Sequence, residues 1–436
     1  MASEVREIGV GLLGLGNVGS GVVKLLAENA AAVEQRLGAR VVVRKIAVRA
    51  AEKRRLVDVD KKLITTDVNA VIDDPSVEIV VELVGGDSEA RDYVLRAIHK
   101  KKHVVTANKA LLAIHGSELF ALAESKDVDI YFEAAVCGGV PIIRALREGL
   151  ASDRIQELRG IVNGTSNFIL TAMTDEGRAF EDVLADAQKA GYAEADPSLD
   201  VDGIDAAHKL AVLCLVAFGA KVNFDDIYVE GLRGLAPIDF EYAKKFGFII
   251  KPLVIARAHE DGIEARVHPA MVPERWLLAS VSGVNNAVYV SSAALGNSMY
   301  YGRGAGMMAT AVAVVSDVFE VSKNLLAHAS GARPVRGVPT QKPLPIRDMG
   351  KLSTRYFLRF AVLDQPGVLA QIARLLADHQ ISIAQVVQEG KRAPDKPVTV
   401  VILTHEARES NVRLALAQAD KLSSVVEKTR LLRIAE

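Results

Sequence analysis

A glycine-rich junction near the start of the chain most constrains its fold. Residues Ile8–Leu13 form a short apolar run typical of a buried parallel strand, and a helical pattern follows it as far as Gly38. Between the two stand three glycines in the pattern G-x-G-x-x-G, namely Gly14, Gly16 and Gly19. Such glycines allow a tight turn, close approach to a pyrophosphate, and close packing of helix on strand. The junction therefore predicts a dinucleotide site at the start of this helix, at Asn17 and Val18, rather than a plain flexible turn.

The second predicted strand indicates which dinucleotide binds. It spans Val41–Val48 and ends at Arg49, with "EKRR" shortly after. Enzymes that use NAD usually carry Asp or Glu at this point to hold the ribose hydroxyls. A cation there favours a 2′-phosphate, so NADP(H) is favoured over NAD(H), with Arg49 as the contact. A solvated basic loop stays open as the alternative.

Length and composition predict a cytoplasmic protein of several domains. The chain of 436 residues is too long for one core, and 53 basic against 54 acidic residues provide no field for nucleic acid or membrane. We expect no signal peptide and no membrane span. Cys137 and Cys214 lie in apolar surroundings and are expected to be buried thiols. The nine histidines are scattered, so no catalytic transition metal is expected.

Strands and helices continue to alternate after the second strand, which predicts a doubly wound α/β sheet. A strand within Val77–Gly86 is followed by a helix over about 88–100, and Val104–Val105 is followed by a polar turn and another helix. Ligands of such sheets lie beyond the carboxyl ends of the strands. Thr106, Asn108, Lys109 and Glu133 are therefore expected at one rim, although a lysine in a turn is more often solvated.

The segment Gly191–Ala220 combines an acidic stretch with a lysine on a buried helix. Its carboxylates are Glu194, Asp196, Asp200, Asp202 and Asp205. Asp205 and Lys209 are four residues apart on one helical face, and beyond Leu210 the helix is apolar nearly all round. Acids at such a mouth suit a cationic ammonium group, and a partly desolvated lysine can exchange a proton. From these residues alone, an ordinary surface ion pair between Asp205 and Lys209 is an equally good interpretation.

Several longer motifs resemble homoserine dehydrogenase. They are "GLLGLGNVGSGVV", "VVTANKALLA", "FEAAVCGGVPII", "GIVNGTSNFIL", "GYAEADPSLDVDGIDAAHKLAVL" and "YYGRGAGMMATAVAVVSDV". The resemblance runs from about residue 8 to about 320 and is to the monofunctional form. It implies NAD(P)-dependent interconversion of L-homoserine and L-aspartate 4-semialdehyde, a step toward threonine, isoleucine and methionine. The alternatives are another NAD(P) oxidoreductase on a short hydroxy or amino acid, and a non-catalytic amino-acid sensor.

The resemblance also implies roles for individual residues. Lys209 falls on the proposed general acid/base, and Lys109 on a lysine close to nicotinamide and substrate. The substrate's polar groups would be held by Glu194, Asp200 and Asp205. The predicted cofactor contacts are Gly14, Gly16, Asn17, Val18, Gly19, Arg49, Thr106, Lys109, Gly191 and Gly302. A structural sodium ion on main-chain oxygens is expected at Glu133, Val136, Gly138 and Val140.

The remainder of the chain predicts a separate regulatory unit. Four prolines within 331–348 indicate a linker, which we place at 331–353. Residues 354–436 follow a β-α-β-β-α-β pattern, a ferredoxin-like unit, and "LDQPGVLAQIA" resembles the ACT domain. This implies an amino-acid effector such as threonine near Asp364–Leu369, or a role in oligomerisation only.

The expected architecture has three parts. A Rossmann-like NAD(P)-binding domain covers 1–140, and a helix at about 305–325 returns to it. An α+β domain for substrate binding and dimerisation covers 141–304, and the ACT domain follows the linker. We expect a homo-oligomer, either a dimer or a tetramer, with no nucleic-acid or membrane partner.

Overall fold

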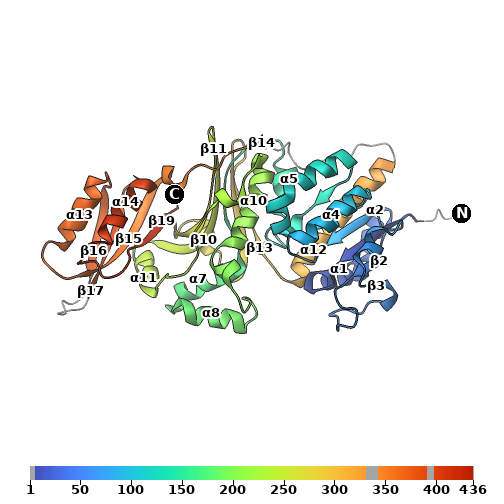
Figure 1. Cartoon of the computed structure of the whole chain (residues 1–436), viewed down its shortest axis with the longest axis horizontal. Helices are drawn as coiled ribbons and strands as arrows, with labels where there is room; N and C mark the ends of the chain where they lie inside the picture. The colour runs from blue at the N-terminus through green and yellow to red at the C-terminus, as the bar shows by residue number, and fades with distance from the viewer. Residues whose placement is uncertain (1–4, 330–341, 390–396, 436) are drawn as a thin grey trace.

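The computed structural model describes residues 5–329, 342–389 and 397–435. Three parts lie in a row, with the N-terminal part at one end and the C-terminal part at the other (Figure 1). Residues 331–341 of the predicted linker fall outside the described residues. Across the described ranges, no helix is both long and apolar enough to cross a membrane.

The N-terminal part contains a six-stranded parallel sheet with the order β3-β2-β1-β4-β5-β6. Its strands are β1 (Glu7–Leu13), β2 (Arg40–Ala47), β3 (Ile64–Thr65), β4 (Ile79–Glu82), β5 (His103–Thr106) and β6 (Ile130–Tyr131). This is the strand order of doubly wound dinucleotide-binding folds. The side on which successive strands are added to the sheet changes between β1 and β4. The predicted fold class is therefore confirmed, and the glycine junction lies at this change.

The helices of this part are α1 (Asn17–Glu28), α2 (Ala30–Leu37), α3 (Val68–Ile72), α4 (Ser88–His99) and α5 (Lys109–Lys126). The single helix expected up to Gly38 is wrong in one respect, because Asn29 leaves the helical conformation and divides it into α1 and α2. Asparagine competes for backbone hydrogen bonds and so favours such ends. Gly38, with φ +74°, ends α2.

Helix α12 (Met307–Ala329) follows the central part in the sequence but packs on α1 of the N-terminal part. Ala311, Val314 and Val318 are fully buried in the same core as Val10 of β1. Gly21 of α1 lies directly against this helix, so the two backbones approach closely. The helix thus completes the N-terminal core.

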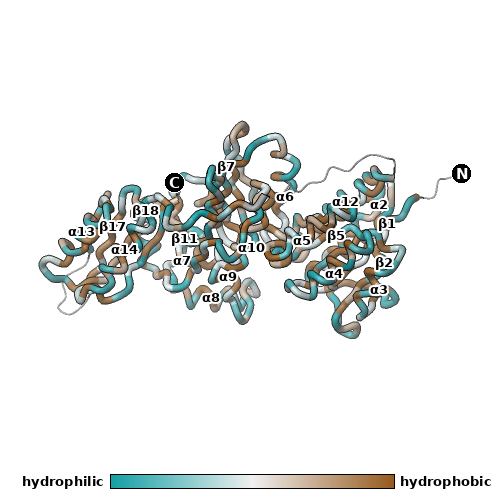
Figure 2. The backbone as a smooth tube through the Cα atoms, turned by 45° about the horizontal axis from the view of Figure 1, so that its top comes forward, coloured by the Kyte–Doolittle hydropathy of each residue, from teal (hydrophilic) through white to brown (hydrophobic). Residues whose placement is uncertain are grey.

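The central part is a mixed sheet covered by helices. Its main strands are β7 (Ile155–Ile161), β9 (Tyr228–Val229), β10 (Phe248–His259), β11 (Gly262–Pro273), β12 (Asn285–Ser292) and β13 (Gly296–Arg303). Its helices are α6 (Ile142–Arg144), α7 (Gly164–Glu176), α8 (Phe180–Lys189), α9 (Ser198–Val201), α10 (Ile204–Phe218) and α11 (Pro237–Lys245). Helix α10 is buried along most of its length, and Figure 2 shows it as a largely hydrophobic stretch in the middle of the molecule.

The C-terminal part confirms the predicted β-α-β-β-α-β pattern. Its main elements are β15 (Ser353–Leu363), α13 (Val368–Asp378), β16 (Ile383–Glu389), β17 (Pro397–Thr404), α14 (Glu409–Ala419) and β19 (Arg430–Ile434), with the short β18 (Ala407–Arg408) beside β15. The strand order β19-β15-β17-β16 is that of a ferredoxin-like sheet.

The C-terminal sheet continues the central sheet rather than standing apart from it. Strand β19 pairs in parallel with β11 through Ala270–Arg433 and Met271–Ile434. The end of the predicted linker is also ordered, because β14 (Lys342–Pro343) pairs with β8 (Ala220–Lys221) and the Pro345 oxygen accepts a hydrogen bond from Ile263.

Candidate active site

The glycine turn after β1 is shaped by close backbone contacts. Gly14 has φ +107°, and a Cβ there would lie 2.8 Å from the Leu83 oxygen. A Cβ on Gly19 would lie 2.3 Å from the Gly14 oxygen, whereas one on Gly16 would meet nothing within 4 Å. Gly14 and Gly19 are thus required by packing. Gly16 faces open space at the N-terminus of α1, where a phosphate can approach.

The end of β2 presents cations to this turn's side of the sheet. The Arg49 side chain is 84% exposed, and its guanidinium lies 3.8 Å from the Glu89 carboxylate. The next loop surrounds a cavity whose lining includes Lys53, Arg54, Arg55 and Lys61. A pair this exposed contributes little stability, so Arg49 can exchange Glu89 for another anion.

The rim after β4 and β5 is organised by a buried acid that the sequence did not reveal. Glu82 is fully buried and accepts hydrogen bonds from the Thr106 hydroxyl at 2.6 Å and from the Val84 amide at 2.9 Å. Asn108 caps α5 through the Leu111 amide, at 3.1 Å. Lys109 is therefore the first residue of α5, placed at the carboxyl end of β5, as ligands of such sheets require.

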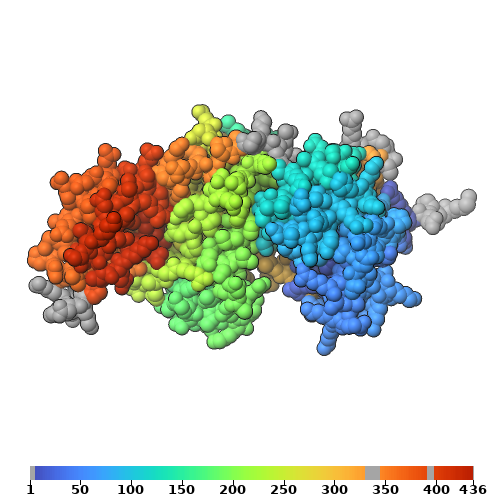
Figure 3. Space-filling view, in the orientation of Figure 1, coloured from blue at the N-terminus to red at the C-terminus, as the bar shows by residue number. Residues whose placement is uncertain are grey.

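Two lysines from different parts of the chain meet on one carboxylate. Asp205 lies in the first turn of α10 with its side chain 11% exposed. The Lys209 Nζ is 2.6 Å from Asp205 Oδ2, and the Lys109 Nζ is 3.1 Å from Oδ1. The Lys209 ammonium also donates to the Val162 oxygen at 2.8 Å. The N-terminal and central parts are thus joined at the two lysines predicted from the sequence as catalytic. Figure 3 shows a notch in the molecular outline between these parts.

The surroundings keep this pair charged. Burial alone would lower the pKa of the Lys209 amine, but the attraction of Asp205 and Asp200 raises that pKa above its usual value. Burial would raise the pKa of Asp205, but the two ammonium groups hold it well below its ordinary range. At neutral pH Asp205 is therefore a carboxylate and Lys209 an ammonium group.

Asn163 links two of the predicted acids, and sequence reasoning missed it. Its Nδ2 donates to Asp200 Oδ1 at 2.7 Å and to Asp205 Oδ2 at 2.8 Å, while its Oδ1 accepts from the Ser166 amide. Burial raises the pKa of Asp200, which the hydrogen bond from Asn163 opposes. An asparagine before a helix is ordinarily interpreted as a cap, and the only other signal was its place in a quoted motif.

The structure brings only two of the five acids to Lys209. Asp202 pairs with Arg233 at 2.6 Å, and Asp196 caps the turn at Ser198. Glu194 is exposed, and within the described residues no hydrogen bond or ion pair joins its carboxylate to the cluster. Gly191, predicted as a cofactor contact, is a turn residue with φ +75°. The irregular segment that we expected also contains one helical turn, α9, which carries Asp200.

The glycine break after β6 packs against the segment "GRGAG". Gly138 has φ +44°, and a Cβ there would lie 2.5 Å from the Gly304 oxygen. Gly302 is close as well, since a Cβ on it would lie 3.4 Å from Val140. Val136 and Val140 are buried, and so is Glu133, whose carboxylate accepts from the amides at the start of α6 (Ile143 and Arg144). The break is thus a buried turn between the two parts.

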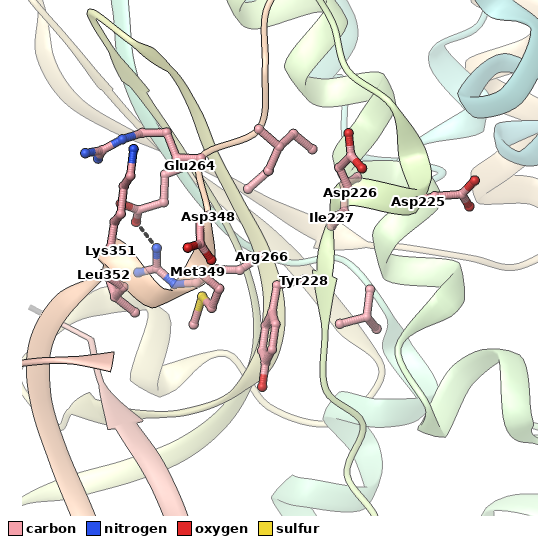
Figure 4. A pocket seen from close by; sticks show the side chains of 14 residues that line it. Asp225, Asp226, Ile227, Tyr228, Glu264, Arg266, Asp348, Met349, Lys351 and Leu352 are labelled. Atoms are coloured by element: carbon pink, nitrogen blue, oxygen red, sulfur yellow. Dashed lines mark ion pairs between the residues drawn. The ribbon is translucent and has the colours of Figure 1, made fainter. Parts of the chain in front are cut away.

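A separate cavity of about 600 Å³ lies between β9, β11 and residues 346–352 (Figure 4). None of the predicted site residues lines it. Its buried Arg266 pairs with Glu264, and Arg347 pairs with Asp261 at 3.0 Å, so these cations already have partners. This cavity is therefore not the candidate active site.

Known families match each part of the chain. Residues 14–133 match the NAD-binding domain of homoserine dehydrogenase, 141–319 match homoserine dehydrogenase itself, and 356–423 match the ACT domain. The homoserine dehydrogenase of Pseudomonas aeruginosa is 44% identical over 97% of this chain and 97% of its own. This chain belongs to the homoserine dehydrogenase family. The homoserine dehydrogenase of Bacillus subtilis is 41% identical to this chain over 97% of both chains.

Solved structures agree with this assignment. A homoserine dehydrogenase from Thiobacillus denitrificans is similar with a TM-score of 0.92 and 46% identity, covering 99% of both chains. A hyperthermophilic archaeal homoserine dehydrogenase in complex with NADPH has a TM-score of 0.62 and 25% identity, covering 73% of this chain and 98% of its own. As a homoserine dehydrogenase, the chain is an NAD(P)-dependent oxidoreductase that interconverts L-homoserine and L-aspartate 4-semialdehyde.

Proposed function

We propose that Lys209 is the general acid/base of this homoserine dehydrogenase and that Lys109 adds a second positive charge near the reacting oxygen. The observation that carries the proposal is the shared carboxylate, because Asp205 contacts both ammonium groups, at 2.6 and 3.1 Å. An ordinary surface ion pair between Asp205 and Lys209 would not require the lysine to be buried. Here the Lys209 side chain is 13% exposed and also hydrogen-bonded to the main chain.

These residues account for the chemistry in both directions. In reduction of the semialdehyde, negative charge grows on the carbonyl oxygen, and the Lys209 ammonium stabilises that charge and donates the proton. The bound nicotinamide supplies or accepts the hydride. In oxidation of homoserine the same amine takes the proton, so it must first be neutral. Because its pKa is raised, oxidation increases with rising pH.

The acids around Lys209 provide the substrate site. Asp200 is held by Asn163 and lies beside Asp205, so it is the acid best placed to receive the substrate's ammonium group. Glu194, at the exposed end of the segment, is proposed to close over the substrate from outside. Asp200 is less exposed than Glu194. Asp200→Asn should therefore reduce substrate affinity more than a replacement of Glu194 does.

Replacement of Lys209 tests the proposal. Lys209→Met removes the proton donor but keeps the length of the side chain, so kcat should fall about 10²–10⁴-fold while NADPH still binds. Lys189→Met is the matched control, since Lys189 lies on the surface with its side chain 79% exposed. If folded Lys209→Met reduces the semialdehyde at the wild-type rate, Lys209 does not carry the chemistry.

We also propose that NADP(H) is preferred. Arg49 follows β2 where an acid would hold the ribose of NAD, and the similar archaeal enzyme was solved with NADPH. The open space at Gly16 fits a pyrophosphate at the α1 N-terminus. Arg49→Asp should weaken binding of NADP more than of NAD, whereas Arg36→Asp, on the exposed end of α2, should alter neither. Equal losses for both cofactors would show that Arg49 does not contact the 2′-phosphate.

A structural sodium ion at the glycine break is a further part of the proposal. Among the described residues, no group of three His, Cys, Asp or Glu side chains forms a metal site, so main-chain oxygens would have to hold the ion. The buried turn through Val136, Gly138 and Val140 has the donor type that a hard cation needs. Sodium should raise the unfolding temperature more than equal concentrations of choline, and no difference would argue against the site.

The ACT domain is proposed to bind an amino-acid effector near Asp364–Leu369, at the start of α13. Gly367, with φ +93°, forms the turn that begins this helix. Titration calorimetry with threonine and the other amino acids of the pathway tests the proposal. We further propose a homo-oligomer, for which analytical ultracentrifugation gives the mass.

A further inference from the structure

A buried arginine joins the ACT domain to the central part. Arg433 lies on β19, at the point where this strand pairs with β11, and it is only 2% exposed. On the ACT side its Nε and Nη2 contact the two oxygens of Glu409, at 3.0 and 2.6 Å. Glu409 is itself buried at the start of α14. The guanidinium is therefore fixed in a bidentate pair.

The same guanidinium also contacts two residues of the central part. Arg433 Nη1 lies 3.0 Å from Glu230 Oε2, and Nη2 lies 3.0 Å from the Tyr228 hydroxyl. Tyr228 donates to Glu230 at 2.7 Å, and Arg413 of α14 reaches the same hydroxyl at 2.6 Å. Two ACT-domain arginines thus hold the side chains of Tyr228 and Glu230, while the backbone of these residues pairs with β11.

Residues 228–233 in turn contact the segment that carries the substrate acids. The Leu232 amide donates to the Val201 oxygen at 2.8 Å, and Arg233 pairs with Asp202 at 2.6 Å. A Cβ on Gly231 would lie 2.6 Å from that same Val201 oxygen, so the two backbones lie in direct contact. Asp200 directly precedes Val201. A movement of residues 228–233 therefore moves the acid.

We propose that Arg433 is a positioning residue of the active site, which holds Asp200 in place through Tyr228, Glu230 and the Leu232–Val201 hydrogen bond. This inference rests on the proposed role of Asp200 in holding the substrate. Displacement of a positioning group by about 1 Å is enough to reduce catalysis substantially. The ACT domain is then a structural part of the substrate site, whatever its effector.

The test compares two ion pairs that connect the same two parts of the protein. Glu230→Gln and Arg433→Met break the pair that leads to Asp200. Arg359→Met breaks a second buried pair, since Arg359 of β15 lies 2.6 Å from Asp239 of α11, and serves as the matched control. In the full-length protein, KM for the semialdehyde should rise about tenfold in the first two variants, with KM for NADPH within about twofold. Arg359→Met should leave both KM values near those of the wild type.

Arg433→Met and Arg359→Met both risk misfolding, because they leave Glu409 and Asp239 buried without these partners. Glu230, with its side chain 24% exposed, is the milder site and decides the question if Arg433→Met does not fold. Hydrogen exchange over residues 198–205 provides a second measurement, which should be faster in Glu230→Gln than in Arg359→Met. Equal exchange and an unchanged substrate KM in Glu230→Gln would overturn the proposal.

Asp200→Asn, measured in parallel, separates this inference from the proposed function. If Asp200→Asn leaves the substrate KM unchanged, the assignment of Asp200 is wrong and the positioning role falls with it. If Asp200→Asn raises that KM and Glu230→Gln does not, Asp200 holds the substrate but Arg433 does not position it. A rise in both supports the proposal.

Discussion

At the scale of single residues, one carboxylate joins the residues that we propose for catalysis. Asp205 is nearly buried, and a buried carboxylate is costly unless cations and donors surround it. Lys209, Lys109 and Asn163 supply those partners from three different helices or their caps. The same contacts that stabilise the carboxylate also raise the pKa of Lys209 and hold the two lysines close together. The stability of Asp205 and the proposed catalytic role of Lys209 therefore depend on one group of atoms.

The stability contributed by Asp205 should depend on pH in a defined direction. Its pKa in the folded protein is lowered from 3.8, so its contribution is present above that value and is lost as pH falls through the lower, folded pKa. Asp205→Asn should lower the free energy of unfolding by roughly 3 kcal/mol near neutrality. Urea denaturation across pH should show this difference constant from about pH 5 to 9 and shrinking in more acidic solution. A difference that grows on acidification would contradict it.

Asn163 should matter twice, as a helix cap and as a donor to the acids. Asn163→Ala removes the cap of α7, which costs about 1 kcal/mol. It also removes the amide between Asp200 and Asp205, so KM for the semialdehyde should rise. Asp67→Ala removes the cap of α3 and should cost similar stability without changing that KM. Steady-state kinetics with thermal unfolding separates the two effects, and equal KM values in both variants would reduce Asn163 to a cap.

At the scale of elements, the glycine turn offers two positions with different constraints. Gly19→Ala places a methyl group against the Gly14 oxygen, so it should lower both stability, by about 1–3 kcal/mol, and NADPH affinity. Gly16→Ala enters open space in the free protein, so it should lower NADPH affinity alone. Thermal unfolding with and without NADPH checks both variants. Equal destabilisation of the free protein by the two would contradict this division.

At the scale of the whole molecule, the ACT domain shares a core with the central part. Phe357, Val401 and Leu432 of its sheet pack in one cluster with Phe240 of α11 and Met271 of β11. Removal of the ACT domain would expose this cluster and the edge of β11 together.

Truncation after residue 352 should therefore leave a chain that aggregates rather than a smaller soluble dehydrogenase. In the full-length protein, calorimetry should show the central part and the ACT domain unfolding in one transition. Size-exclusion chromatography checks the truncated chain. A monodisperse, active truncated protein would show that the shared core is not needed for folding.

The sequence by itself determined the order of elements and predicted the residues of the site. Period-two and helical patterns depend on neighbours along the chain, so they predicted the parallel sheet, the buried helix α10 and the ferredoxin-like pattern of the C-terminal part. Residue types in the quoted motifs identified the family before any fold was known.

Only the tertiary structure decided which of these residues meet. Whether Lys109 contacts Asp205, which of five acids faces Lys209, and whether Glu82 and Asn163 take part depend on how distant elements pack. The same holds for β19, whose pairing with β11 makes one sheet of two domains. Such contacts are absent from local patterns because they arise from burial of side chains and backbone edges across the chain, which the fold fixes as a whole.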